Sequence, residues 1–361
     1  MSSQHPAPFH GSYLPGDVQF LLAPLQLEMT PVAEKEQLIQ SGQKHYSEML
    51  SQEPAPSPAH LALFSQALTA GAPRMAREVA ALAKGLIEQL GQQPIVLVSL
   101  VRAGVPLGVM LQRALTELRH EAYHYGISII RDRGIDEAAI NLIEARHGTA
   151  GIVFVDGWTG KGAITAQLTA SLHERQGYPA IPRLVVLADP AGCAWLAASE
   201  DDWLIPFGIM GAPVSGMVSR SVWTESGFHG CVRCEHLREY ECSTRLVDTV
   251  DRFRRELLPE AVAPAQPFAT RRSEQRSRSR LVLDKLATRF GIDNLNRIKP
   301  GIAEATRAVL RRVPDYVLVR NKADPDVLLL VRLAEQKGLD IQEVGEEIGP
   351  YRAVTIIKKV A

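Results

Sequence analysis

Two kinds of hydrophobic pattern alternate between residues 94 and 189. The short apolar runs PIVLVSL (94–100), GIVFVD (151–156) and RLVVLAD (183–189) have the length and composition of strands buried on both faces of a parallel sheet. Between them, GVPLGVMLQRALTEL (104–118) and KGAITAQLTASLHERQG (161–177) carry apolar residues at helical spacing. Strands separated by such helices predict an α/β domain with a mostly parallel sheet, which binds ligands at the carboxyl ends of its strands.

A second pattern follows in the last third of the chain. Residues 259–280 (PEAVAPAQPFATRRSEQRSRSR) lack hydrophobic periodicity, so we expect a basic, flexible linker there. Residues 281–361 combine helical patterns with the strand-like runs DYVLVR and YRAVTIIK, which predict a small α/β sandwich. The first domain is therefore expected to span residues 1–258, and its first sixty residues, a Pro-rich lead-in, are assigned no chemistry.

Composition supports this division. The 361 residues are 46% hydrophobic, enough for two cores, and the formal net charge is zero. Residues 1–270 hold 21 basic and 28 acidic residues, and the remainder holds 19 and 12, so the last third suits a polyanionic partner. The chain has no apolar run of about eighteen residues and no signal-peptide pattern, and we expect a cytoplasmic protein whose four cysteines stay reduced.

The sharpest motif is GIVFVDGWTGKGAIT (151–165), in which a buried strand ends at Asp156 and a Gly-rich turn leads into a helix. Such a turn can present backbone N–H groups and a helix N-terminus to a phosphate. The residues expected to bind phosphate are Gly157, Thr159, Gly160, Lys161 and Gly162. The spacing matches neither a Walker A loop nor a dinucleotide fingerprint, and the alternative is a tight turn without a ligand.

This motif resembles the signature with which type I phosphoribosyltransferases bind phosphoribosyl pyrophosphate (PRPP). In that family the strand usually ends in two acids, whereas Gly157 takes the second position here, and the loop is shorter. The resemblance implies a type I phosphoribosyltransferase-like fold. It also implies that Asp156 reads the ribose hydroxyls and holds Mg²⁺ indirectly.

Two further segments resemble parts of the same family. Arg102, Ala103 and Gly104 follow a strand as the family's pyrophosphate loop does, and residues 129–148 match its mobile loop. The resemblance implies catalytic roles for Asp156, Arg102, Arg131 and Arg133, which would neutralise the departing pyrophosphate together with Mg²⁺. Each arginine could instead be solvated or paired with a nearby acid. The residues proposed for a nucleobase-like acceptor pocket are Ser215, Gly216, Ser219 and Arg220.

Residues 298–339 resemble the RNA-binding fold shared by Pelota and the ribosomal proteins that bind kink-turn RNA. Gly301, Glu304, Thr306 and Arg307 stand where that fold begins its Gly-x-x-Glu-x-Thr-Lys helix, with Arg for Lys. The residues expected to meet RNA are Lys299, Gly301, Glu304, Thr306, Arg307, Arg311 and Arg312. A solvated helix, or a fold retained for protein binding, is the alternative.

The two resemblances cover most of residues 90–225 and 280–360. Together they resemble a bacterial family in which a phosphoribosyltransferase-like domain precedes a Pelota-type domain, associated with stress and tellurite-resistance gene clusters. The leading hypothesis is a phosphoribosyltransferase that uses PRPP and Mg²⁺ on a nucleobase-like acceptor and is coupled to RNA binding. A non-catalytic RNA-binding regulator that senses PRPP, and a cysteine-dependent hydrolase, are the alternatives.

The cysteines bear on that last alternative. The stretch from 229 to 242 contains His229, Cys231, Cys234, His236 and Cys242. One CxxC pair without a second does not favour a structural zinc site. Relatives of the family are sometimes labelled cysteine proteases, and Cys193 could be a nucleophile with His229 as its base. No activated thiolate can be inferred from the local sequence, because that requires an electropositive setting and an oriented histidine.

Overall fold

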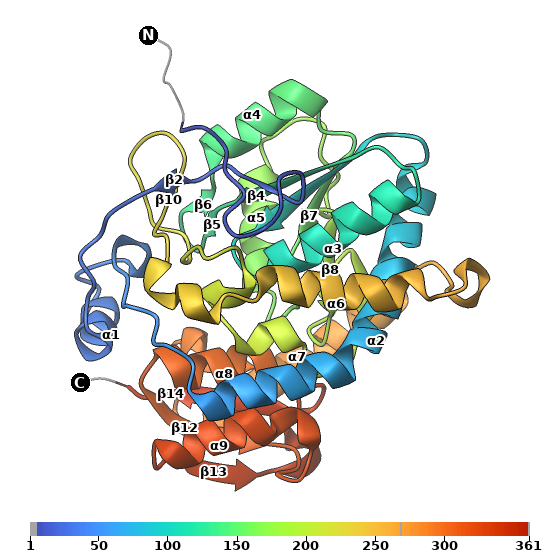
Figure 1. Ribbon diagram of the computed structural model, residues 1–361. Helices are drawn as coiled ribbons and strands as arrows, with labels where there is room; N and C mark the ends of the chain where they lie inside the picture. The colour runs from blue at the N-terminus through green and yellow to red at the C-terminus, as the bar shows by residue number, and fades with distance from the viewer. Residues whose placement is uncertain (1–5, 268, 360–361) are drawn as a thin grey trace.

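The chain folds into a large α/β domain and a smaller C-terminal domain that packs beneath it (Figure 1). The computed structural model describes residues 6–267 and 269–359. Within this part of the chain, no helix is both long and apolar enough to cross a membrane.

A six-stranded sheet forms the centre of the large domain. Its strands, in spatial order, are β1 (Gln19–Phe20), β4 (Ala122–Ile127), β3 (Ile95–Leu100), β7 (Ile152–Val155), β8 (Leu184–Ala188) and β9 (Leu196–Ser199). All neighbouring pairs are parallel. The predicted α/β class and the strands expected from the three apolar runs are confirmed.

Helices cover both faces of this sheet. Helices α2 (Pro58–Leu90), α3 (Gly104–Glu117) and α6 (Ser243–Arg255) share one apolar core with it, and α4 (Glu137–His147) and α5 (Ala163–Leu172) share the other. Strand β3 serves both cores, because successive side chains of a strand point to opposite faces: Ile95 and Leu97 lie in the first core, and Val96 and Val98 in the second. This explains the unbroken apolar run.

The C-terminal domain has a four-stranded mixed sheet. Its spatial order is β11 (Ile298–Pro300), β14 (Ala353–Ile357), β12 (Pro314–Val319) and β13 (Asp340–Glu343). Strand β14 is antiparallel to both of its neighbours, and β12 and β13 are parallel. Helices α7 (Ala269–Arg289), α8 (Ile302–Arg311) and α9 (Leu328–Gln336) belong to this domain, which agrees with the small α/β domain that was predicted.

The remaining elements are short. They are β2 (Ala23–Pro24), β10 (Gly230–Cys231), β5 (Ile129–Ile130), β6 (Gly134–Ile135), α1 (Val32–Gln40) and the 3-10 turns Tyr46–Glu48, Pro206–Ile209, Ala212–Val214, Glu235–Tyr240, Pro259–Ala261, Leu295–Arg297, Pro325–Val327 and Gly345–Ile348. Two segments are more regular than their sequences suggest. Helix α7 begins inside the expected linker, and the expected mobile loop 129–148 forms β5, β6 and α4, because Asp136 caps α4 by accepting the Ala139 N–H.

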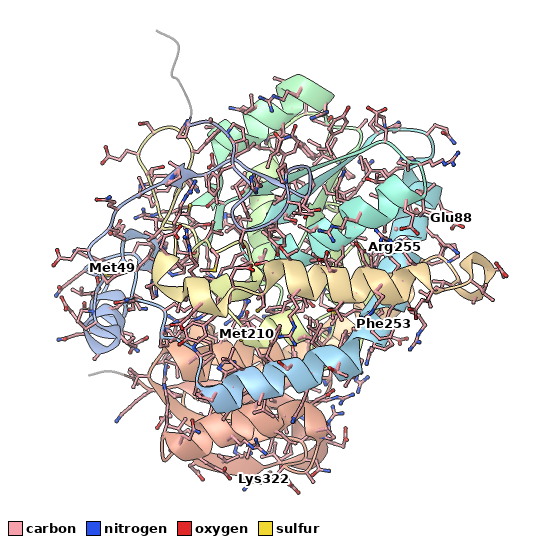
Figure 2. All side chains as sticks on the ribbon, viewed as in Figure 1. Met49, Glu88, Met210, Phe253, Arg255 and Lys322 are labelled. Atoms are coloured by element: carbon pink, nitrogen blue, oxygen red, sulfur yellow. The ribbon has the colours of Figure 1, made fainter. Side chains whose placement is uncertain are left out.

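The two domains are joined by apolar and polar contacts. Ala303 of α8 and Leu329 of α9 belong to the apolar core of the large domain. The carboxylate of Asp202 accepts N–H groups from Ile302 and Arg352 at 3.0 and 2.8 Å, so the large domain caps a helix of the small one. Helix α8 therefore lies on the side of the small domain that faces the large one, and β13 lies on the far side, as does Lys322 (Figures 1 and 2).

Candidate functional site

Two cavities lie where the domains meet, and α8 lines both of them. The first is formed by the turn after β7 together with β11 and Glu304, and we call it the turn cavity. The second is lined by Cys234 and His236, the N-terminal segment and Arg311, and we call it the thiol cavity. Their volumes are about 150 and 390 Å³. Only the thiol cavity reaches the range of roughly 300–1,000 Å³ that is usual for small-molecule sites.

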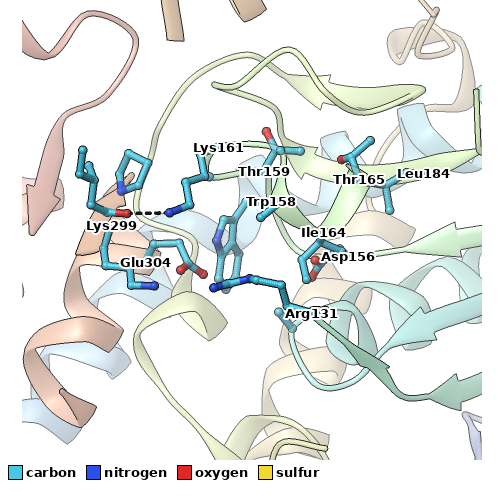
Figure 3. A pocket seen from close by; sticks show the side chains of 16 residues that line it. Arg131, Asp156, Trp158, Thr159, Lys161, Ile164, Thr165, Leu184, Lys299 and Glu304 are labelled. Atoms are coloured by element: carbon cyan, nitrogen blue, oxygen red, sulfur yellow. Dashed lines mark hydrogen bonds between the residues drawn. The ribbon is translucent and has the colours of Figure 1, made fainter. Parts of the chain in front are cut away.

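The turn cavity contains most of the residues expected to bind phosphate. The Arg131 guanidinium points toward the Glu304 carboxylate, the Lys161 ammonium points toward a backbone carbonyl of β11, and Asp156 lies apart from them (Figure 3). Thr159, Gly160 and Gly162 also line this cavity, and Gly157 stands against the backbone of Ala103.

Several polar groups of this turn already have partners in the protein. The N–H of Gly157 donates to the Asp156 carboxylate at 2.7 Å, and that of Thr159 donates to the Ala188 carbonyl at 3.0 Å. The Lys161 ammonium donates to the carbonyls of Leu295 and Ile298 in the C-terminal domain. The turn thus holds the two domains together.

Burial governs the charges in the turn cavity. It raises the pKa of the Asp156 carboxyl to about 7 and lowers that of the Lys161 ammonium to about 6, the latter with the help of nearby Lys299 and Arg131. Both groups are therefore poorly suited to carrying full charge at neutral pH. Within the described residues, no group of three or more His, Cys, Asp or Glu side chains is placed to hold a metal ion.

The residues of the segment expected to form a pyrophosphate loop make structural contacts within the protein or line the turn cavity. Arg102 is buried and donates to the Glu53 carboxylate at 2.5 Å and to the Val218 carbonyl at 3.2 Å. Ala103 lines the turn cavity. Gly104 sits so close to β7 that a Cβ atom there would be 2.0 Å from the Val155 carbonyl oxygen, which explains the glycine by packing.

The two arginines expected in the mobile loop, Arg131 and Arg133, lie in different surroundings. Arg131 lines the turn cavity, and its backbone N–H donates to the Tyr46 hydroxyl at 2.7 Å. Arg133 pairs with Glu48 and lies over the Trp223 ring, 4.7 Å from its centroid. Only Arg131 faces a cavity.

The residues expected around an acceptor base do not form one pocket wall. Ser215 is buried and donates to the Gly211 carbonyl, and Gly216 packs against Phe20. Ser219 and Arg220 instead line the thiol cavity. The Arg220 guanidinium is held there by three backbone carbonyls, those of Ser221, Tyr46 and Met49.

The residues expected to meet RNA face the large domain. Lys299 is 8% exposed, Gly301 lies against Asp202, and Thr306 is buried and donates to the Ile302 carbonyl. Glu304, Arg307 and Arg311 share one face of α8, at i, i+3 and i+7, and this face lines the cavities and contacts the large domain. Arg307 stacks over Trp158 at 4.6 Å, and Arg312 forms two hydrogen bonds with the buried Glu36, at 2.5 and 2.7 Å.

The four cysteines are free thiols in different settings. Cys231 and Cys242 are buried in the core, where burial raises the pKa of each to about 12. Cys193 is partly exposed, lies against Gly162 at the start of α5, and donates to the Ala191 carbonyl. Cys234 lines the thiol cavity.

His229 is not arranged as a base for Cys193. Its Nδ1 is 2.7 Å from the Ser128 hydroxyl, and its backbone N–H donates to Asp136. The histidine that shares a cavity with a cysteine is His236, whose Nε2 lies 2.9 Å from the Glu53 carbonyl oxygen. Because a carbonyl only accepts, Nε2 carries the proton, and Nδ1 of the neutral ring is left as the acceptor.

Comparison with known proteins now identifies the family. Residues 11–251 match the family model described as tellurite-like stress resistance cysteine protease StiP. The chain belongs to the StiP family. It is 50% identical over 366 residues to the "Cysteine protease StiP" of Acinetobacter baylyi, an alignment that covers 98% of this chain and 95% of that protein.

Two other matches add to this picture. Residues 277–359 match the model of the PELOTA RNA-binding domain, as the sequence predicts. A solved structure, glycine decarboxylase (P-protein) of the glycine cleavage system in inhibitor-bound form, is 14% identical, covers 94% of this chain and 88% of its own, and has a TM-score of 0.23.

Membership of the StiP family overturns the leading hypothesis. The family and its 50% identical member are named as cysteine proteases, so the prediction of a phosphoribosyltransferase that acts on PRPP is wrong. The structure supplies a physical reason: the lysine of the supposed phosphate turn is used in a domain contact, and the cavity beside it is small. The predicted association with stress resistance and an RNA-binding domain is supported.

Sequence reasoning missed three residues of the thiol cavity. Lys35 and Glu53 come from the N-terminal lead-in, to which no chemistry was assigned, and Cys234 was weighed only as a zinc ligand. The CxxCxH spacing of Cys231, Cys234 and His236 was the one local signal, because it puts a thiol and an imidazole two residues apart.

Proposed function

We propose that the protein is a cysteine-dependent peptidase and that Cys234 is its nucleophile. The observation that carries the proposal is that Cys234 shares a cavity of about 390 Å³ with His236 and four arginines. A cysteine nucleophile needs a base and an electropositive setting, and this cavity provides both. Cys193, the alternative, has Arg276 beside it but lines neither of the two cavities, and the histidine expected as its base is bound elsewhere.

The surroundings of Cys234 determine its protonation state, and from this follow the roles of the thiol and of His236 in the proposed reaction. Burial raises the pKa of its thiol to about 11, against the opposing effect of Arg102 and Arg311, so the resting group is a thiol. In the proposed reaction Nδ1 of His236 takes the thiol proton as the sulfur attacks a peptide carbonyl. The imidazolium then gives that proton to the departing amine. Water hydrolyses the thioester, releasing a carboxylic acid and restoring the thiol.

The test compares single variants of the whole protein on a fluorogenic peptide library. Cys234→Ala should abolish hydrolysis, because it removes the sulfur that is proposed to form the thioester. Cys193→Ser is the matched control and should retain most of the activity. A wild type that cleaves no peptide would refute the peptidase, and activity that is lost in Cys193→Ser but kept in Cys234→Ala would refute the choice of nucleophile.

We also propose that the C-terminal domain binds RNA. The match of residues 277–359 to an RNA-binding domain model and the basic charge of this part of the chain support the proposal. The α8 residues expected to meet RNA lie against the large domain, so this face would become available only when the domains separate. The experiment for this proposal is set out with the domain interface below.

A further inference from the structure

Basic and apolar side chains both line the thiol cavity. Among its lining residues, five basic side chains face two carboxylates. The five are Lys35, Arg102, Arg220, Arg233 and Arg311, and the two are Glu53 and Glu235. An excess of positive charge around a partly enclosed space favours an anionic ligand.

Most of these positively charged side chains already bind acceptors within the protein. Glu53 binds Arg102 at 2.5 Å, lies 3.7 Å from Arg311, and also accepts the Ala212 N–H. Arg220 is held by three backbone carbonyls. These contacts hold Arg102, Arg220 and Arg311 in place, and Glu53 is the one carboxylate among these partners.

Lys35 is different. It is 7% exposed and lines the cavity, and within the described part of the chain its ammonium makes no hydrogen bond and no ion pair. Removing an ammonium from most of its water without giving it an acceptor is costly. Burial and the charges of Arg220 and Arg312 lower its pKa to about 8, which an anion placed beside it would reverse.

The apolar part of the lining suits a peptide. Met29, Val32, Leu50 and Leu310 supply an apolar surface, and the hydroxyl of Ser51 is buried without a hydrogen-bond partner. A nucleic acid backbone would bring a charge at every residue against this surface, whereas a peptide offers apolar side chains, a free N–H or C=O for Ser51, and an isolated carboxylate.

We propose that the thiol cavity selects peptides that present a carboxylate and that Lys35 is the residue that binds it. This inference rests on the proposed peptidase function, to which it adds the class of substrate. The carboxylate can belong to an acidic side chain or to the C-terminus of the peptide. In either case Lys35 forms the ion pair that it lacks in the free protein, and the neighbouring Arg311 adds to the attraction.

The test measures binding to the full-length Cys234→Ala protein, which cannot turn its ligand over. The probes are acetyl-Leu-Gln-Leu-Ala-amide, its Glu counterpart, and the Gln peptide with a free C-terminal carboxylate, each followed by titration calorimetry. A charge-assisted hydrogen bond predicts that at least one carboxylate peptide binds about tenfold to a hundredfold more tightly than the neutral one. Whichever of the two carboxylate peptides binds more tightly than the neutral peptide shows whether the carboxylate comes from a side chain or from the C-terminus.

Substitution of Lys35 decides its role. In the same background Lys35→Met, which keeps the buried stem, should remove the preference while leaving the affinity for the neutral peptide unchanged. Lys44→Met, at an exposed lysine, is the control and should keep the preference. If Lys35→Met does not fold, as judged by its thermal melting, Lys35→Gln replaces it.

Three outcomes would overturn the proposal: equal affinity for all three peptides, a preference that survives substitution of Lys35, or inorganic phosphate binding through Lys35 more tightly than the best peptide. Its failure is distinct from that of the peptidase. Hydrolysis by the wild type without a carboxylate preference refutes only the substrate class. A Lys35-dependent preference without any hydrolysis refutes only the enzyme.

Discussion

At the scale of single residues, burial sets the chemistry of the cysteines more than neighbouring charge does. Cys234 has Arg102 and Arg311 nearby, and its thiol pKa is nevertheless raised to about 11. The same holds for Cys193 beside Arg276, with Asp189 adding to the effect of burial. A thiol of this kind becomes reactive when a base takes its proton, which is the role proposed for His236.

This leads to a pH prediction for Cys234. Because the pKa of its thiol is raised, the thiolate fraction should rise about tenfold per pH unit from pH 7 to 10, and alkylation by iodoacetamide should rise in parallel. The rate is measured by brief alkylation followed by peptide mass spectrometry, which separates Cys234 from the other thiols. An ordinary exposed cysteine levels off above about pH 8.5, and such a plateau at Cys234 would contradict the assignment.

At the scale of elements, the turn between β3 and α3 is shaped by close packing. Gly104 begins α3, and its Cα faces the end of β7. The backbone of Val155 cannot move aside without disturbing the parallel ladder between β3 and β7. The Arg-Ala-Gly sequence that resembles a pyrophosphate loop therefore has a structural explanation.

Gly104→Ala should consequently destabilise the protein. The added Cβ would meet the Val155 carbonyl oxygen at 2.0 Å, and relieving this clash should cost about 3 kcal/mol of the free energy of unfolding. Gly16→Ala is the control, because Gly16 has a φ of +95° but no atom near its Cβ position, and about 1 kcal/mol of backbone strain is expected there. Urea denaturation measures both, and equal losses would contradict the packing argument.

Elements with a strong local pattern were predictable from sequence. Strands β3, β7 and β8 and helices α3 and α5 lie where continuous apolar runs and helical spacing indicate them. The structure of residues 129–148 was not predictable in this way. This charged segment is ordered by the Asp136 cap and by the pairing of β5 with β6.

The candidate site was predictable only in part. The turn after β7 was found, but its role was misassigned, because Lys161 donates to carbonyls of Leu295 and Ile298, more than a hundred residues away. Lys35 and Glu53 reach the thiol cavity only through packing of the N-terminal segment against both domains. No local pattern encodes such contacts.

At the scale of the whole molecule, the interface decides which surfaces are accessible. Helix α8 turns side chains expected to meet RNA toward the large domain, where Glu304 lines the turn cavity and Arg311 lines the thiol cavity. The proposed peptide site and the proposed RNA surface thus share helix α8, and the closed arrangement of the domains covers the RNA surface.

Loosening the interface should increase RNA binding. Asp202→Ala removes the carboxylate that caps α8 and holds the Arg352 N–H, so Arg307 and Arg311 should become available to phosphates. We expect RNA retention by the full chain to rise about tenfold and to fall more steeply with salt. Filter binding between 50 and 300 mM salt provides the measurement.

The control for this experiment is Glu200→Ala, which removes one negative charge at an exposed residue nearby. An equal gain in this variant would mean that net charge alone explains the effect. Unchanged retention in Asp202→Ala would show that RNA binds a different face, and no retention by any variant would refute RNA binding.

The capping of α8 by Asp202 also concerns the order in which the molecule is made. The helix starts at a glycine, which has no side chain to cap it, and its capping carboxylate lies 100 residues earlier in the chain. On the ribosome the large domain emerges first and can fold before Ile302 is synthesised. The Asp202 carboxylate is then already in place when α8 is synthesised, so the second domain can fold against the surface of the first.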